Sequence, residues 1–120
     1  MRGMKYALLA AIAALFPSPV IALGIPDQYQ PVIQIVGWQA KDIPKLAEII
    51  ECESHWDVYA VGAQGELGLA QIMPETWEDA RERLGSEAPP AWVAWTNPAT
   101  QFYQAKIIHA ERGFEPWACA

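Results

Sequence analysis

Apolar side chains recur at three- and four-residue steps from residue 43 onward, which is the spacing of one face of an α-helix. Asp42 can cap the start of this helix, and Pro44 is compatible with its first turn. The buried face is expected to consist of Ile43, Leu46, Ala47 and Ile50. Continued along the helix, this face reaches Glu53 at its edge, whereas Glu48 and Glu51 fall on the solvent side.

A glycine-dense loop follows this helix. Gly62, Gly65 and Gly68 stand within seven residues, which marks a tight loop where the backbone passes close to another group. Residues 74–84 then have a helical pattern that begins at a proline, carries acidic residues early and stops at Gly85.

The last predicted helix covers residues 98–112. Asn97 is its expected cap, Pro98 occupies the first turn and Gly113 marks its end. A loop rich in proline and tryptophan separates it from the preceding helix. The pattern as a whole predicts a mainly helical domain, with a glycine-rich loop or at most a short β excursion around residues 62–68.

The first 22 residues have the pattern of a secretory signal peptide. Arg2 and Lys5 precede the apolar run Tyr6–Phe16, and the small residues Val20 and Ala22 fit a cleavage site after residue 22. A membrane anchor is the alternative, but eleven helical residues span only roughly 16 Å of a ~30 Å hydrocarbon core. We therefore expect export to the periplasm or the extracellular space, with no stable membrane insertion after cleavage.

The remaining chain divides into two parts. Residues 23–41 contain two prolines and a short apolar run, and form either an extended lead-in or a weak first helix. The folded domain is expected to span residues 42–120.

The charge balance narrows the classes of partner. The whole chain carries a net charge of −6, and loss of the two basic residues of the leader would bring it near −8. Such an acidic chain is not expected to bind nucleic acid, or a membrane surface by electrostatics. A glycan, which is recognised by hydrogen bonds and stacking, remains compatible with this charge.

Two cysteines, Cys52 and Cys119, are the number needed for one disulfide in an oxidising compartment. Two unrelated buried thiols are the alternative. A zinc site that also uses His55 and His109 can be drawn, but these residues lack a recognised zinc-motif spacing, and we predict no metal.

Glu53 is the first candidate for chemistry. A carboxyl group held against apolar surface keeps its proton more readily and can act as an acid. In the alternative interpretation Glu53 caps the helix end or pairs with Arg81 or Lys106.

Two separated motifs carry a resemblance to a known family. The pair Glu53–Ser54 at a helix end is followed, after about nine residues, by a glycine-rich turn and by G-x-x-G-L-x-Q-I-M-P-x-T over residues 65–76. This resembles the catalytic core of the lysozyme-like superfamily, and most closely the soluble lytic transglycosylase (SLT) domain. The resemblance runs from about Ile43 to Trp77 and more loosely to the C-terminus. It implies a small lysozyme-like fold of the α+β superfamily.

A second resemblance concerns the cysteines. "CES…W" near residue 52, paired with "GFEPWAC" at the end, is similar to the resuscitation-promoting-factor type of this fold. In that type, a cysteine before the catalytic glutamate is bridged to one near the chain end. The resemblance therefore implies a disulfide between Cys52 and Cys119.

The resemblance also implies roles for individual residues. Glu53 matches the single catalytic acid of the family, and Gln71 and Met73 match positions that line the sugar cleft. Gly65 and Gly68 match the turn that lets the backbone approach the substrate.

Three departures from the family pattern stand out. Gly62 replaces a serine that often hydrogen-bonds the catalytic carboxyl group or the sugar, and Ala70 replaces a usual methionine. No Y-N-A-G segment is present, so Tyr103 is only a positional candidate for the tyrosine that orients the acid.

The implied activity is lytic cleavage of peptidoglycan strands by one carboxyl group, without metal or cofactor. It would serve wall remodelling, lysis, or a secretion, conjugation or phage machine. A hydrolytic muramidase is the alternative, with Glu66 or Asp57 as its second carboxylate, although Asp57 is expected to be a turn or cap residue. A non-catalytic glycan-binding module also stays open.

The tryptophans have simpler expectations. Trp56 and Trp77 are expected in the core, and Trp117 is expected to pack around the bridge. Trp92 and Trp95 are expected either to stack on a sugar or to pack.

Overall fold

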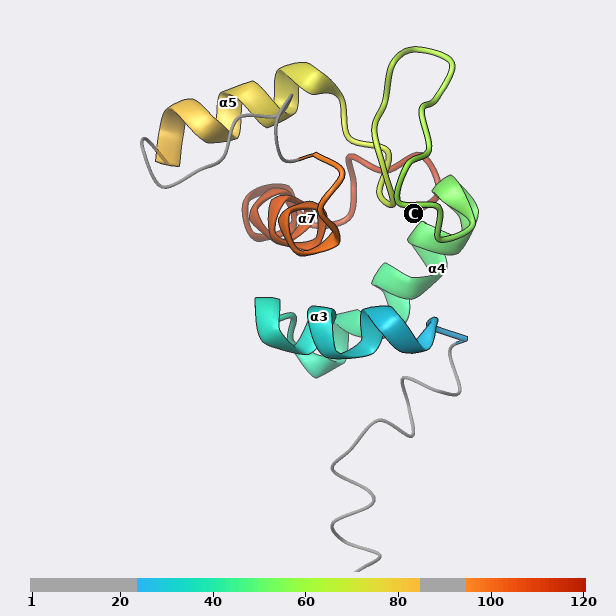
Figure 1. Cartoon of the computed structure of the whole chain (residues 1–120). Coiled ribbons are helices and arrows are strands. Elements are labelled where there is room, and N and C mark those ends of the chain that lie inside the picture. Colours follow the sequence, from blue (N-terminus) through green and yellow to red (C-terminus); the bar gives the residue numbers. More distant parts are fainter. Residues whose placement is uncertain (1–23, 85–94) are drawn as a thin grey trace, which may run out of the picture.

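The computed structural model describes residues 24–84 and 95–120, without the side chains of residues 80, 81, 83 and 84. The predicted leader, Gly85 and Trp92 lie outside the described residues. In chain order the elements are η1 (Asp27–Tyr29), α3 (Gln30–Val36), η2 (Ala40–Asp42), α4 (Ile43–Ser54), α5 (Pro74–Leu84) and α7 (Pro98–Arg112). Helix α7 lies between α3 and α5 and packs against both (Figure 1).

Helix α4 confirms the predicted apolar face. Its buried positions are Ile43, Leu46, Ala47, Ile49, Ile50 and Ser54. Asp42 occupies the predicted N-cap position of this helix, but its side chain makes no capping hydrogen bond. Asp42 instead ends the 3-10 turn η2, where its carboxylate lies 3.2 Å from Lys41 Nζ and 3.8 Å from His109 Nε2. The preceding turn leads directly into the helix and takes the place of a side-chain cap.

Helix α7 begins and ends as predicted. The Asn97 side chain accepts a hydrogen bond from the Ala99 amide at 2.8 Å, and Gly113 ends the helix with a positive φ of 65°. Its buried face includes Phe102 and Ala105, which bring α7 into the centre of the core.

Two forms were considered for residues 23–41, an extended lead-in and a weak helix, and the described part, residues 24–41, contains the helical elements η1, α3 and the start of η2. Helix α3 packs on α7, and Trp38 Nε1 donates to the Phe102 carbonyl at 3.0 Å. Tyr29 stacks on Trp56 with ring centroids 5.9 Å apart. Burial raises the pKa of the Tyr29 phenol, and the nearby Asp57 carboxylate acts in the same direction. This segment therefore shares the core of the following helices.

The predicted fold class is confirmed. Between α4 and α5 the described chain forms only two isolated antiparallel bridges, Val61–Leu67 and Leu67–Ile72. The fold is mainly helical with a minimal β excursion and one disulfide, between Cys52 and Cys119. Because both cysteines are in this bridge, the zinc alternative has no thiolate ligands left.

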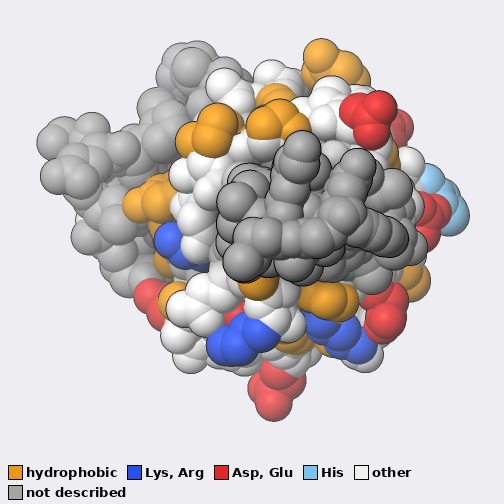
Figure 2. Space-filling model, turned by 90° about the horizontal axis from the view of Figure 1, so that it is seen from below, with side chains coloured by type: hydrophobic (Ala, Val, Ile, Leu, Met, Phe, Trp, Pro, Cys, Tyr) orange, Lys and Arg blue, Asp and Glu red, His pale blue; other side chains and the backbone are white. Residues whose placement is uncertain are grey.

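On the face shown in Figure 2, acidic and basic side chains are interspersed, and the described residues form no continuous basic surface there. None of the helices within residues 24–84 and 95–120 is long and apolar enough to cross a bilayer.

Candidate active site

Glu53 lies in the last turn of α4, next to the disulfide. Its side chain is half-buried, and Oε2 accepts a hydrogen bond from the backbone amide of Cys119 at 3.3 Å. The alternative pairing with Lys106 does not occur, since Lys106 Nζ donates to the Val36 carbonyl at 3.4 Å. The side chain of Arg81 lies outside the described part. The C-terminal tail thus contacts the candidate acid directly.

The end of α4 is fixed by the residue after Glu53. Ser54 is buried, and its hydroxyl donates to the Leu69 carbonyl at 2.7 Å. His55 and Trp56 have positive φ values of 53° and 64°, so the chain reverses at once after the helix. The helix end and the glycine-rich loop are therefore joined next to Glu53.

Gly62 contacts two of the predicted site residues. A β-carbon at residue 62 would lie 2.5 Å from Gln71 Oε1 and 2.6 Å from Glu66 Oε1. Side-chain oxygens therefore fill the space that a serine side chain at residue 62 would occupy. The same distances place these two oxygens within about 5.1 Å of each other. A carboxylate and a carboxamide therefore lie where the resemblance led us to expect a hydroxyl group.

Both of these side chains are held by the loop itself. Glu66 Oε1 accepts from the Gln64 amide at 2.8 Å. Gln71 has a positive φ of 52°, and its Nε2 donates to the carbonyls of Gly68 and Ala60 at 2.9 and 3.3 Å. These bonds leave the Gln71 Oε1 atom directed at Gly62.

Asp57, the other carboxylate considered, is used in a turn. Its side chain accepts a hydrogen bond from the Tyr59 amide at 2.9 Å, as expected for a turn residue. The structure brings Glu66 and Gln71 together at Gly62, whereas the Asp57 side chain is engaged in its own turn.

The close approach at Gly68 is made by Gln101, a residue that sequence analysis missed. Gln101 is buried on α7, and its Oε1 accepts from the Leu69 amide at 2.8 Å. Its Nε2 donates to the carbonyls of Val58 and Trp95. A glutamine in line with Ala105 and Ile108, on the apolar face of the last helix, was the available signal.

Gly68→Ala should lower the free energy of unfolding by about 2–4 kcal/mol. The φ of 79° strains any side chain, and the new β-carbon would lie 2.5 Å from the Gln101 amide carbon. Gly65→Ala is the matched control, because its φ is 91° but nothing lies within 4 Å. It should cost only about 1–2 kcal/mol. Urea unfolding of both variants measures the difference, and equal losses would show that Gln101 does not restrict residue 68.

The remaining site candidates lie at different depths. Tyr103 is 41% exposed on α7 and makes no hydrogen bond with Glu53 in the described structure. Trp77 is buried in the core as expected. Trp95 is partly buried and packs against the core. Trp117 is buried, and its Nε1 donates to the Ala70 carbonyl at 2.9 Å.

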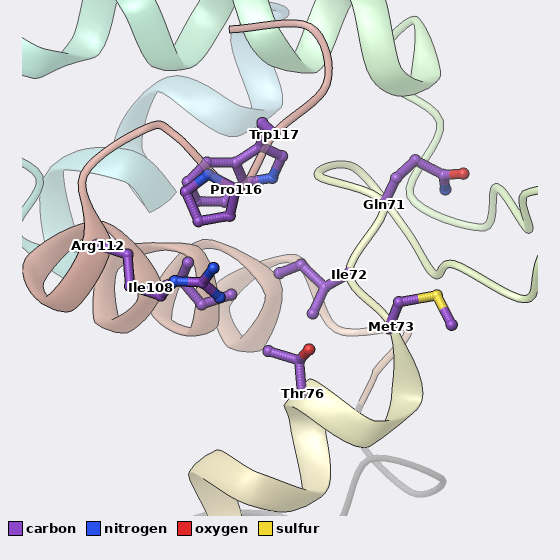
Figure 3. Close-up of a pocket in the computed structure, with 8 residues that line it drawn as sticks. All are labelled: Gln71, Ile72, Met73, Thr76, Ile108, Arg112, Pro116 and Trp117. Atoms are coloured by element: carbon purple, nitrogen blue, oxygen red, sulfur yellow. The ribbon is translucent and has the colours of Figure 1, made fainter.

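A pocket of about 210 Å³ opens beside this tail (Figure 3). Gln71 and Met73 stand at one edge and Arg112 at the opposite edge. The full lining is Gln71, Ile72, Met73, Thr76, Ile108, Arg112, Pro116 and Trp117. Two of the residues that the resemblance assigned to a sugar cleft therefore border an open pocket.

The described residues contain no group of three or more His, Cys, Asp and Glu side chains placed to hold a metal ion.

Comparison with protein families gives one match. The model of the Transglycosylase SLT domain matches residues 37–106, more than half of the chain. The chain therefore belongs to the SLT transglycosylase family, within the lysozyme-like superfamily. Searches of curated proteins and of solved structures found no match. Family membership supports a transglycosylase-type action on peptidoglycan, which lies outside the cytoplasm. The match ends before the tail that contacts Glu53.

Proposed function

We propose that this protein is an exported lytic transglycosylase that cleaves the β-1,4 bond between N-acetylmuramic acid and N-acetylglucosamine. Its main support is the position of Glu53, the family's acid, at a helix end that a disulfide, a buried serine and the tail amide hold in place. A fixed carboxyl group next to an open loop suits proton transfer to a bound strand.

One carboxyl group suffices for the proposed reaction. Protonated Glu53 donates to the glycosidic oxygen, because an alkoxide is a poor leaving group. The 2-acetamido group of the muramyl residue stabilises the cationic carbon. The Glu53 carboxylate then takes the proton from the muramyl C6 hydroxyl, which attacks C1 and closes the 1,6-anhydro ring.

A hydrolytic muramidase is the second candidate, and the position of Glu66 favours keeping it. Hydrolysis needs a second group to activate water or to act as nucleophile. Glu66 is half-buried beside Gln71, whereas the side chain of Asp57 is used in a turn. A glycan-binding module without activity is the third candidate, supported by the glycine at residue 62.

Mass spectrometry of the muropeptides released by the protein distinguishes these activities. We expect products with 1,6-anhydromuramic ends, each one water lighter than the reducing-end product of hydrolysis. If all products carried reducing ends, the transglycosylase proposal would be rejected in favour of a muramidase. Glu66 would then be the residue to test. If the protein bound the wall but released no product, the non-catalytic glycan-binding module would be the remaining candidate.

Export is part of the proposal. It rests on the predicted leader at residues 1–22, and a disulfide is the bond expected of a protein that folds in an oxidising compartment. N-terminal sequencing of the protein recovered from the periplasm or the medium should give a chain that begins at Leu23.

A further inference from the structure

The pocket between α5, α7 and the tail shares Gln71 and Met73 with the predicted sugar cleft, but the proposed cleavage gives no role to its other polar side chains. Its walls are largely apolar, with Ile72, Ile108 and Pro116 among them, but Thr76 adds a hydroxyl and Arg112 a cation. In Figure 3 the Arg112 side chain reaches from the end of α7 toward Ile108, into the space below Pro116. A positive charge at the edge of an apolar pocket is a feature that a negatively charged ligand would use.

Arg112 is free to take such a ligand. Lys41 and Lys45 pair with acidic neighbours, and Lys106 donates to a backbone carbonyl. Of the Lys and Arg side chains that the structure describes, Arg112 alone has no ion pair or hydrogen bond with the protein. Arg112 is exposed at the edge of the pocket, so its guanidinium is open to a ligand there.

The pocket is too small for a whole substrate. Sites that enclose a complete ligand usually measure about 300–1,000 Å³, whereas this pocket has about 210 Å³. It fits one branch of a larger molecule whose main part binds elsewhere.

The pocket also lies close to the candidate acid. Trp117 lines it, and the amide of Cys119, two residues further on, donates to Glu53 Oε2 at 3.3 Å. Two residues of extended chain span at most about 7 Å, so the Trp117 backbone, at one wall of the pocket, lies within about 10 Å of the Glu53 carboxylate. A branch of a sugar bound at or next to Glu53 can reach that far.

We infer that this pocket is a subsite for a carboxylate-bearing branch of the muramyl residue, with Arg112 as its counter-charge. The inference rests on the proposed function, because the anionic branches of a peptidoglycan strand are the carboxylates of the stem peptide and, where the peptide has been removed, the lactyl carboxylate. Arg112 offers the planar donor pair that a carboxylate prefers, and the apolar walls cover the carbon atoms of the branch.

Binding can be measured without cleavage in the Glu53→Gln background. Three glycans of equal length serve as probes in titration calorimetry: strands with stem peptides, the same strands after amidase treatment, and chitin oligosaccharides, which carry no carboxylate. Adding Arg112→Gln should weaken binding of the carboxylate-bearing strands by about tenfold relative to chitin. Lys45→Gln removes the same charge from the exposed side of α4 and should change none of the three affinities.

The pattern of losses identifies the source of the carboxylate. A loss for peptide-bearing strands alone indicates a stem carboxylate, and a loss for amidase-treated strands indicates the lactyl carboxylate. Arg112→Lys keeps the charge and should recover part of the affinity. Equal effects of Arg112→Gln on all three glycans, or no effect on any, would overturn the inference. Cleavage by the protein with Glu53 intact is a separate measurement, and its absence would reject the proposed function alone.

Discussion

Glu53→Gln should reduce the release of muropeptides at least about a thousandfold, while the protein stays folded. Glutamine keeps the size of the side chain and can still accept the hydrogen bond from the Cys119 amide. It cannot supply a proton to the glycosidic oxygen or take one from the C6 hydroxyl. Because one group performs both transfers in the proposed reaction, its loss removes the acid and the base together.

Two other carboxylates make the test specific: Glu51 serves as a matched control, and Glu66 distinguishes the two activities. Glu51 lies two residues earlier on the same helix, is exposed and pairs with His55, so Glu51→Gln should keep wild-type rates. Glu66→Gln should have a small effect if the enzyme is a transglycosylase, and a large one if Glu66 activates water. The turbidity of a cell-wall suspension and a thermal melt are measured for each variant. Substantial turnover by the Glu53→Gln variant would show that Glu53 is not the catalytic acid.

Local sequence signals predicted most of the helical framework. The apolar period from residue 43 gave the buried face of α4, and Asn97 and Gly113 gave both ends of α7. These signals work because caps and periodic faces depend on residues a few positions apart. Asp42 stands at the expected N-cap position, but its side chain makes no capping bond because a preceding 3-10 turn, which the pattern did not indicate, already leads into the helix.

The contacts that shape the candidate site could not be predicted in this way. Gln101 fixes Leu69 from 32 positions away, and Cys119 reaches Glu53 across 66 positions. Such pairs depend on how the helices pack, which no local pattern encodes. The glycines illustrate the limit: their density predicted close approaches, but only the structure shows that Gln101 approaches Gly68 and that Gln71 and Glu66 approach Gly62.

Loss of the Cys52–Cys119 bridge should lower stability strongly. The bridge joins residues 67 positions apart, and closing a loop of that length contributes roughly 4 kcal/mol in the chain-entropy model. For a domain of this size such a loss corresponds to a fall in Tm of roughly 20 °C. Cys52 is exposed, so a reductant can reach the bond in the folded protein. Thermal melts with and without reductant, and of the double variant Cys52→Ala/Cys119→Ala, measure the effect.

Activity should fall as well, even at temperatures where the reduced protein remains folded. The bridge holds the tail against the end of α4, and from that position the Cys119 amide donates to Glu53 Oε2. Without the bridge the residues after Trp117 lose their covalent tie to α4, and the candidate acid loses a group that orients it. Rates should therefore be compared below the lower Tm, with circular dichroism confirming the helix content. If the cleavage rates were unchanged below the lower Tm, the bridge would have a purely stabilising role. Two free thiols per chain in protein made in an oxidising compartment would contradict the bridge itself.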